Sequence, residues 1–512
     1  MAQPPEGPEA PAPAGPPPGA AKPRRMALVF LGSRGDCQPY VALALGLLAR
    51  GHEVTAFSNA MHRSFVEAYG IKFVAFAPER VVIQGKQEDL HALGAELFSN
   101  NTFGEDLEVF AREVRNFAPD ILLSGTLVDK FCQPLAVALG VPVLALSLQN
   151  PLPNRRRLPL GIPSFPRSFG WANMLLYRLL VLAQQLAFRQ VDKISQDVIG
   201  VRTWEGVGSR AVWDTVRRVP APYVLVGNPK VIWEAVYDYL PPTLRFTGYW
   251  IVDADRQMSE AGAGQFGGPE ALRELEAFLA AGEPPVCIGW GSMISGTAEE
   301  MALLACGAAR AAGRRAVVVG GWAGLSREKL RAAAAARGRP ELAAYAEGRV
   351  LFCAKAPHEW LFPRCACTVH HGGSGTLAAA LRAGVPTIVT PIAMDQFDLA
   401  EVVQELGVGL GLRKLAKVSE RELGAAIRRA CDSQELRERA AEMGAALRAQ
   451  DGVATAAQEI ERVLALHELG EFRTLVQCAR ERQRELDAAP REVGPARLAL
   501  GLAAAAWAGG GG

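Results

Sequence analysis

Short apolar runs alternate with amphipathic segments along most of the chain. Such runs, bounded by glycine or polar residues, are typical of buried strands, and in the first half they cover residues 26–32, 53–57, 71–76, 120–125 and 141–147. Between them, apolar residues recur at helical spacing in residues 39–50, 61–69 and 128–139. This alternation predicts a parallel sheet with helices on both faces.

The same pattern repeats in the second half. Five further strand-like runs, with helical segments rich in Ala and Leu between them, cover residues 284–293, 314–322, 348–354, 365–371 and 385–391. Residues 243–266 look like the connection, so we place the domain boundary near residue 242. The sequence therefore predicts an α/β protein with two facing, doubly wound, Rossmann-like domains, residues 26–241 and 242–470. Because ligands of such domains bind at the carboxyl ends of the strands, we expect a site in the cleft between the domains.

The two ends of the chain differ from the rest in composition. Residues 1–25 are rich in Pro, Ala and Gly and carry almost no apolar bulk, which predicts a disordered leader. The apolar run that follows is shorter than the roughly 7–15 residues of a signal-peptide core, so we interpret it as the first buried strand. Residues 471–512 are expected to form a tail with low complexity at its end.

Charge and cysteine content exclude several classes of function. The 512 residues include 55 Lys and Arg against 53 Asp and Glu, a formal net charge of +2, which argues against a broad basic surface for nucleic acid. The 9 cysteines are scattered, which is typical of a reducing compartment. No window reaches the roughly 20 uninterrupted apolar residues of a spanning helix. We therefore expect a cytoplasmic protein that does not bind nucleic acid.

The loop after the first strand carries candidate chemistry. It reads Gly32-Ser33-Arg34-Gly35-Asp36 and shortly precedes a helix. A carboxylate at this place could be a general base at the mouth of the cleft, and Arg34 could bind a phosphate or orient Asp36. The alternative, that Asp36 only caps the helix, stays open on the residues alone.

A second glycine-rich loop follows the strand that ends in His370-His371. Glycine and hydroxyl residues at positions 372–376 open a helix that ends at Gly384. The N–H groups and positive dipole end of such a helix favour an anion of the phosphate kind, and a neutral imidazole can donate to it, although helix capping alone would also explain the motif. A metal site at the two histidines is not expected, because neighbours on a strand point to opposite faces.

Two adjacent polar residues follow the next predicted strand. Asp395 and Gln396 follow residues 385–391 and could bind the hydroxyl groups of a sugar. By themselves they are equally well explained as part of a solvated loop.

Four ordered motifs resemble glycosyltransferase family 1, whose members have the two-domain GT-B fold. The subgroup that the chain resembles most is the sterol 3-beta-glucosyltransferases, with the bacterial glycopeptide glucosyltransferases next. The motifs are GSRGDCQPYVALALGLLARGHEVT from residue 32, FTGYW from 246, IGWGSM from 288, and APHEWLFPR from 356 with HHGGSGT, RAGVPTIV and DQF. The resemblance covers about residues 26–450.

The resemblance implies an inverting transfer of glucose from UDP-glucose to the hydroxyl of a hydrophobic acceptor, with a sterol as the first choice. It implies that Asp36 is the catalytic base and that no metal or other cofactor takes part. The positions implied to bind the donor are Ser33, Arg34, Ser292, Ala356, His358, His371, Ser374, Gly375, Thr376, Asp395 and Gln396. Among these, Ala356 and His358 would hold the uracil base, and Asp395 and Gln396 the glucose. Residues 455–467 would form a helix that crosses back to the first domain.

The sequence leaves the acceptor and the membrane question open. Residues 147–166 contain three consecutive arginines, and Ala393-Met394 departs from the pattern of the sterol enzymes, so another lipid, a phenolic compound or a natural product is an alternative acceptor. A nucleotide-sugar or lipid-binding protein without turnover, and a nucleotide-sugar epimerase, are alternatives from other classes. Residues 155–188 could rest on a bilayer as a basic, aromatic-edged apolar patch, or the helix in them could pack on the sheet with its arginines solvated.

Overall fold

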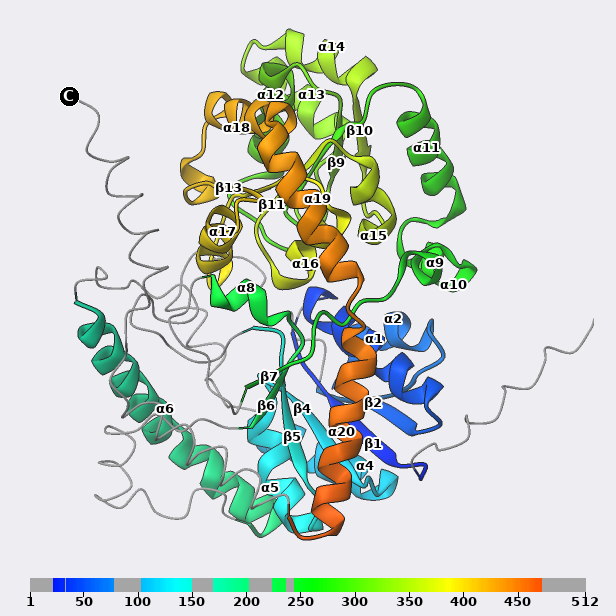
Figure 1. Ribbon diagram of the computed structural model, residues 1–512, viewed down its shortest axis with the longest axis vertical. Helices are drawn as coiled ribbons and strands as arrows, with labels where there is room; N and C mark the ends of the chain where they lie inside the picture. The colour runs from blue at the N-terminus through cyan, green and yellow to red at the C-terminus, as the bar shows by residue number, and fades with distance from the viewer. Residues whose placement is uncertain are drawn as a thin grey trace, which may run out of the picture.

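The chain folds into two lobes, each built around a parallel sheet (Figure 1). The computed structural model describes residues 22–32, 34–77, 103–149, 169–201, 223–235 and 244–471. Within these residues, helices cover both faces of both sheets, as the figure shows. The prediction of an α/β protein with two doubly wound domains is thereby confirmed.

The first sheet has seven parallel strands in the order β3-β2-β1-β4-β5-β6-β7. Its strands are β1 (Arg25–Val29), β2 (Glu53–Asn59), β3 (Lys72–Ala77), β4 (Ile121–Gly125), β5 (Val143–Ser147), β6 (Val224–Val226) and β7 (Leu244–Phe246). The first five match the apolar runs that predicted them. The last two are three residues long and were not predicted, and β7 pairs with β6 beyond residue 242, where we placed the boundary.

Several helices of the first lobe bury apolar side chains in the cores beside this sheet. Their bounds are α1 (Arg34–Ala49), η1 (Ala60–His62), α2 (Arg63–Glu67), α4 (Phe103–Phe117), α5 (Asp129–Leu139), α6 (Gly170–Ile199) and α8 (Lys230–Glu234). Helix α1 begins five residues before the predicted start at Pro39, which lies inside the helix. Since proline has no N–H, it leaves the carbonyl of Gly35 without its usual helical donor.

The second sheet has six parallel strands in the order β10-β9-β8-β11-β12-β13. Its strands are β8 (Val286–Gly289), β9 (Ala316–Val319), β10 (Val350–Cys353), β11 (Cys367–His370), β12 (Thr387–Val389) and β13 (Gly409–Gly411). In each lobe the order reverses beside the first strand of that sheet, between β1 and β4 and between β8 and β11. Ligands of doubly wound folds bind outside the carboxyl ends of the strands at such reversal points.

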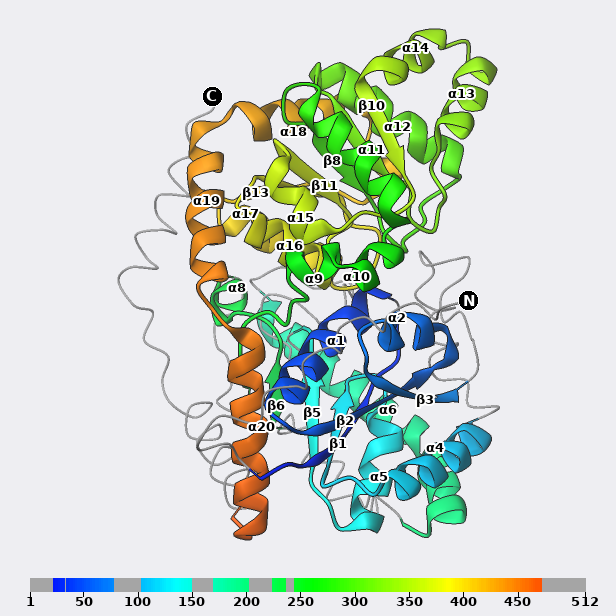
Figure 2. The ribbon, with the colours of Figure 1, turned by 90° about the vertical axis from the view of Figure 1, so that its right-hand side faces the viewer.

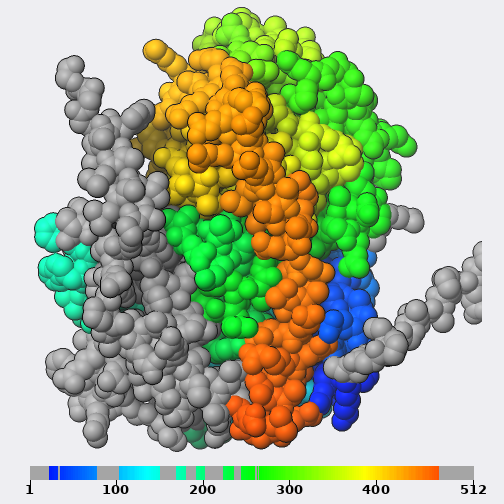
Figure 3. All heavy atoms as spheres, viewed as in Figure 1, coloured from blue at the N-terminus to red at the C-terminus, as the bar shows by residue number. Residues whose placement is uncertain are grey.

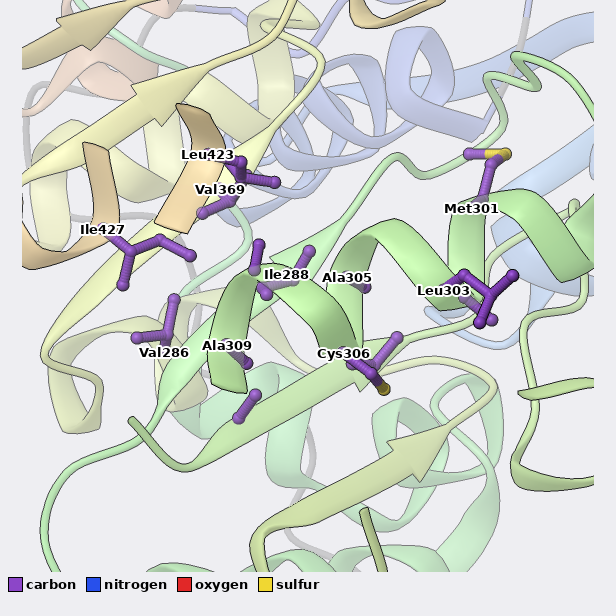
Figure 4. Packing of buried hydrophobic residues seen from close by; sticks show 14 of the residues in the cluster. Val286, Ile288, Met301, Leu303, Ala305, Cys306, Ala309, Val369, Leu423 and Ile427 are labelled. Atoms are coloured by element: carbon purple, nitrogen blue, oxygen red, sulfur yellow. The ribbon is translucent and has the colours of Figure 1, made fainter. Parts of the chain in front are cut away.

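The larger core cluster of the second lobe lies between this sheet and the helices on one of its faces. Figure 4 shows Ile288 of β8 and Val369 of β11 packed with Ala305 of α12 and Ile427 of α18, all fully or almost fully buried. The helices of this lobe and of the connection are α9 (Ala254–Met258), α10 (Glu260–Gln265), α11 (Gly268–Ala280), α12 (Ala298–Ala312), α13 (Arg327–Ala336), α14 (Pro340–Arg349), α15 (His358–Leu361), η4 (Phe362–Arg364), α16 (Ser374–Ala383), α17 (Gln396–Glu405), η5 (Leu415–Lys417), α18 (Glu420–Asp432) and α19 (Gln434–Arg448).

The last described helix ties the two lobes together. After α19, the chain crosses to the first lobe and forms α20 (Gly452–Glu468), which runs along its side (Figures 1 and 2). The space-filling view shows the two helices as one continuous band over both lobes (Figure 3). Ile460 and Val463 are fully buried in the core of the first lobe, and Glu461 pairs with Arg50 at 2.6 Å. The predicted return of this segment to the first domain is confirmed.

The described chain begins inside the segment that we assigned to the leader. Arg25 is the first residue of β1, and its backbone N–H donates to Asp120 Oδ2 at 2.7 Å. The Arg24 side chain contacts Glu468 of α20 at 2.5 Å. The disordered leader therefore cannot extend to residue 25, because these two arginines are held by the fold; residues 1–21 lie outside the described part of the chain.

Candidate functional site

The first turns of two helices meet between the lobes. Helix α1 follows β1, and α16 follows β11, so both begin at the carboxyl ends of strands next to a reversal point. A Cβ placed on Gly375 would stand 3.3 Å from the carbonyl oxygen of Gly35, so the two turns are in contact. The N–H groups at the start of each helix and the positive end of each dipole thus favour an anion at the same place.

The glycines before α16 make room for an imidazole. Gly372 has φ +93°, and a Cβ there would lie 2.7 Å from the Val389 side chain. A Cβ on Gly373 would lie 2.3 Å from Nε2 of His371, and one on Gly291 would lie 3.2 Å from Cε1 of the same ring. The ring of His371 therefore lies between the loop that follows β8 and the loop that opens α16.

The two neighbouring histidines have different roles. His370 is fully bonded inside the lobe: its Nδ1 accepts the N–H of Gly372 at 3.0 Å, and its Nε2 contacts Thr387 Oγ1 at 2.8 Å. Burial and the neighbouring His371 hold the pKa of His370 well below its usual range. Burial and His358 lower the pKa of His371 to about 4, so its ring is neutral at pH 7 and carries one N–H. His371 Nδ1 has no hydrogen-bond partner among the described atoms.

The loop after β8 contributes the opposite wall. Trp290 is buried and donates its indole N–H to Thr390 Oγ1 at 2.9 Å, which fixes the end of the strand. Gly291 has φ +60°, and its carbonyl accepts the N–H of Trp322 at 2.9 Å. The half-buried Ser292 comes next, so the structure brings this predicted residue to the wall that faces His371.

Asp395 is buried at the end of the next strand along the sheet. Its side chain is 8% exposed, and its Oδ2 has no partner among the described atoms. Burial first, and then the carboxylates of Asp398 and Asp36, raise the pKa of Asp395 to about 7. Because Asp36 belongs to the other lobe, the structure brings the two predicted carboxylates within electrostatic range of each other.

The amide oxygen of Gln396 is engaged within its own loop. Its amide oxygen accepts the backbone N–H groups of Ile392 at 2.8 Å and Ala393 at 3.1 Å. This bond closes a tight turn in which Met394 has φ +57°, a conformation that side chains rarely adopt. The oxygen of Gln396 is thus used by the turn, which leaves its amide N–H groups for a ligand.

Asp36 lies in the first turn of α1, directly against Gly32. Gly32 has φ +129°, and a Cβ there would stand 2.6 Å from Oδ2 of Asp36, so only glycine fits. The Asp36 side chain is half-buried. Of the two other predicted residues in this loop, Ser33 and the side chain of Arg34 lie outside the described part of the chain.

Ser374 bonds to the other lobe. Its hydroxyl donates to the carbonyl oxygen of Leu148 at 2.9 Å, just after β5. The Asn228 side-chain amide donates to the same oxygen. Gly375 and Thr376 follow in the first turn of α16 and are half-buried. A hydroxyl that was predicted to bind a phosphate is therefore engaged in a contact between the lobes.

The segment predicted to hold a base lies beside a cavity. Ala356 is buried, and His358 begins α15 with its ring stacked on Phe362 at 4.5 Å between centroids. A cavity of about 380 Å³ opens at the carboxyl ends of β9 and β10. Its lining includes Gly321, Ser326 and Ala354, which precedes Ala356 by two positions, but neither Ala356 nor His358 lines it.

Sequence reasoning missed a second half-buried carboxyl group in the first lobe. Asp129 begins α5, and burial raises its pKa to about 6, although Ser124 donates a hydrogen bond to it at 2.5 Å. Burial first, and then the carboxylates of Asp36 and Asp129, raise the pKa of Tyr40, which lies on α1. The pattern that indicated Asp36, an acidic residue a few positions after an apolar strand, would also have indicated Asp129.

Two family models match parts of the chain. The glycosyltransferase family 28 N-terminal domain matches residues 26–105, and the C-terminal domain of the erythromycin biosynthesis protein CIII-like family matches residues 329–463. Solved structures are similar over both lobes. The glycotransferase of kitacinnamycin is 21% identical, with a TM-score of 0.58 over 86% of this chain and 99% of its own. The glycosyltransferase VinC in complex with DTDP is 18% identical, with a TM-score of 0.58 over 86% and 99%. The chain has the GT-B fold of glycosyltransferases.

Curated relatives of this GT-B chain are sterol 3-beta-glucosyltransferases. The one from Vanderwaltozyma polyspora is 28% identical over 83% of this chain and 33% of its own length. The one from Neosartorya fischeri is 30% identical over 86% of this chain and 29% of its own length. The chain thus spans about a third of the length of the curated relatives it matches. The resemblance that the four motifs indicate is confirmed.

Two further findings concern metals and membranes. Within the described ranges, no group of three or more His, Cys, Asp or Glu side chains could hold a metal ion. Among the helices that the structure describes, none combines the length and the apolar character that a bilayer-spanning segment needs.

Proposed function

We propose that this GT-B chain is an inverting glycosyltransferase that transfers glucose from UDP-glucose to the hydroxyl of a hydrophobic acceptor, with a sterol as the acceptor we favour. The observation that carries the proposal is the meeting of the first turns of α1 and α16 near the neutral ring of His371, with Asp36 and Asp395, from opposite lobes, within electrostatic range of each other. Such a place suits a diphosphate between a base and a sugar.

The first turn of α16 would receive the diphosphate. As the bond from the anomeric carbon to the leaving group breaks, negative charge grows on the diphosphate oxygens. The N–H groups of Gly375 and Thr376 in the first turn of α16 and the one N–H of the neutral His371 ring would donate to these oxygens. Ser292 would complete the site from the β8 loop, and the base would lie at Ala356 and His358, beside the cavity. DTDP is the ligand named with VinC, which supports a nucleoside diphosphate.

Asp36 would take the proton of the acceptor hydroxyl. It lies on the first lobe, and the diphosphate loops lie on the second, so an acceptor on the first lobe can approach the anomeric carbon from the side opposite the leaving group. Attack from that side inverts the anomeric centre, which gives a β-glucoside from UDP-α-glucose. Asp395 and the amide N–H groups of Gln396 would bind hydroxyls of the glucose. No step in this scheme uses a metal.

We also propose that the amino-terminal half of α6 contacts a lipid surface, from which a hydrophobic acceptor would come. Trp171, Leu175 and Leu179 follow one another at helical spacing and are 66%, 43% and 48% exposed. The opposite side of the helix packs on the first lobe, because Asn173 is buried and Ile194 lies against its core. Residues 155–157 lie outside the described part of the chain.

Vesicle sedimentation tests this contact. The double variant Trp171→Ser/Leu175→Ser should bind phosphatidylcholine vesicles more weakly than the wild type. Leu469→Ser, which alters an exposed leucine at the end of α20, is the matched control and should bind as the wild type does. Equal sedimentation of all three proteins would refute the contact.

The activity itself is tested by UDP release. Purified protein with UDP-glucose and a sterol should release UDP, and Asp36→Asn should lower the rate by at least about a hundredfold, the usual contribution of a general base. Binding of UDP should remain. Asp432→Asn, which changes a well-exposed aspartate paired with Arg314, is the control and should keep the wild-type rate. UDP binding without any release, across sterols, phenolics and lipids, would favour a binding protein without turnover.

A further inference from the structure

The backbone that carries Asp36 is held from the neighbouring strand. At the end of β2, the buried Ser58 hydroxyl donates to the carbonyl of Phe30 at 2.6 Å. Three residues after β2 ends, His62 Nε2 lies 3.0 Å from the carbonyl oxygen of Gly32. The carbonyls of Phe30 and Gly32, both between β1 and α1, are therefore hydrogen-bonded by side chains at or just after the end of β2.

The tautomer of His62 follows from its partner. A carbonyl oxygen only accepts hydrogen bonds, so Nε2 of His62 carries the hydrogen and donates it to Gly32. The ring is 3% exposed and lies with its centroid 6.0 Å from that of Phe30. Burial keeps water from replacing this donor, so loss of the ring N–H would leave the Gly32 carbonyl without it.

The Gly32 peptide is in turn the wall against which Asp36 lies. A Cβ on Gly32 would stand 2.6 Å from Oδ2 and 2.8 Å from Cγ of Asp36, which means that the carboxylate packs directly on the glycine backbone. With φ +129°, Gly32 is in a region that other residues rarely adopt, so its orientation depends on the bonds that hold it. A rotation of this peptide would move the Asp36 carboxylate.

We propose that His62 is a positioning residue for Asp36 and acts through the carbonyl of Gly32. The proposal rests on the proposed function, in which Asp36 is the base. The hydrogen bond from His62 fixes the peptide on which the carboxylate lies, so that the carboxylate meets the acceptor hydroxyl at the right place. Ser58 holds the preceding part of the segment in the same way. His62 itself touches no substrate in this scheme.

Two variants of His62 separate its hydrogen bond from its bulk. His62→Phe keeps a ring of similar size without the donor, and His62→Gln keeps an N–H donor. We expect His62→Phe to lower kcat by about tenfold or more, since a small misplacement of a reacting group has effects of this size. The KM for UDP-glucose should stay within about twofold of the wild type, because the loops proposed to bind the diphosphate, the base and the glucose belong to the other lobe. His62→Gln should recover a large part of kcat.

His52 provides the matched control. It is a buried histidine of the same lobe, 3% exposed, and its Nε2 contacts Glu461 of α20 at 3.0 Å. His52→Phe should lower the melting temperature and leave kcat per folded molecule unchanged. A purely structural role of His62 would give this same pattern, so an unchanged kcat of folded His62→Phe would overturn the proposal.

Further outcomes separate the proposal from the function on which it rests. Full activity of Asp36→Asn would refute the base assignment and with it the proposal. Loss of activity in Asp36→Asn with wild-type kcat in His62→Phe would refute the role of His62 alone. If His62→Phe does not fold, Ser58→Ala is the second variant: we expect its kcat to fall by about threefold at unchanged donor KM, and a wild-type kcat would overturn the proposal.

Discussion

The buried carboxyl of Asp395 makes the stability of the ligand-free protein depend on pH. Its pKa is raised from 3.8 to about 7 by burial first and then by Asp398 and Asp36. Between about pH 4 and pH 7, the folded protein therefore keeps a proton on Asp395 that the unfolded chain has released. Protonation of Asp395 contributes fully to the free energy of unfolding below about pH 4, and this contribution is lost as the pH rises to about 7.

The magnitude follows from the shift. A change of about three pKa units corresponds to about 4 kcal/mol, an upper value for a site that a ligand must enter. Asp395→Asn keeps the shape and removes the charge, so the variant should be more stable than the wild type, and its advantage should grow with pH. About 2–3 kcal/mol of the difference lies between pH 5 and pH 8. Since 1 kcal/mol moves the melting temperature by about 2–4 °C for a domain of this size, the variant should gain roughly 5–10 °C over this range.

Thermal unfolding of both proteins at pH 5 and pH 8 is the assay. Asp255→Asn, which alters an exposed aspartate in the first turn of α9, is the control and should show no comparable gain. The same Asp395→Asn variant should lose most glucose transfer, because the carboxylate is proposed to bind a sugar hydroxyl. An equal difference in melting temperature at the two pH values would refute the reasoning.

Two further predictions concern the loop that opens α16. Gly373→Ala places a Cβ 2.3 Å from Nε2 of His371, so the ring must move. We expect the affinity for UDP, measured by calorimetry, to fall by at least about tenfold. An unchanged affinity would show that His371 does not contact the diphosphate. Ser374→Ala removes the hydrogen bond to Leu148 between the lobes and should lower the free energy of unfolding by about 1 kcal/mol in denaturant titrations, whereas a stability equal to the wild type would mean that this contact does not hold the lobes.

Much of the fold could be predicted because apolar runs and buried strands coincide. β4 is buried along its length and β1 from Met26 onward, and each matches an apolar run bounded by loop residues. The strands that were missed are three residues long: β13 reads Gly-Leu-Gly and is a strand only through its pairing with β12. The early start of α1 was missed because Pro39 was interpreted as the first residue of the helix, whereas the helix accommodates it in its second turn.

Residues of the site that lie within a sequence motif could be predicted, whereas contacts between distant segments could not. Asp36, His371 and Asp395 each follow a strand in the sequence, and the structure brings all three to the same place between the lobes. The residues that hold them were not predictable. The Ser374 hydroxyl bonds to a carbonyl of Leu148, 226 positions away, and any residue supplies a carbonyl. The hydrogen bond from His62 to Gly32 was not predictable for the same reason, since its acceptor is also a backbone carbonyl.

The stereochemistry of the product tests the central claim most directly. Purified protein should be incubated with UDP-glucose and a sterol, and the anomeric configuration of the isolated product determined by NMR. A single displacement with Asp36 as base predicts a β-linked steryl glucoside from the wild type and almost none from Asp36→Asn. An α-linked product, or equal product from Asp36→Asn, would contradict it.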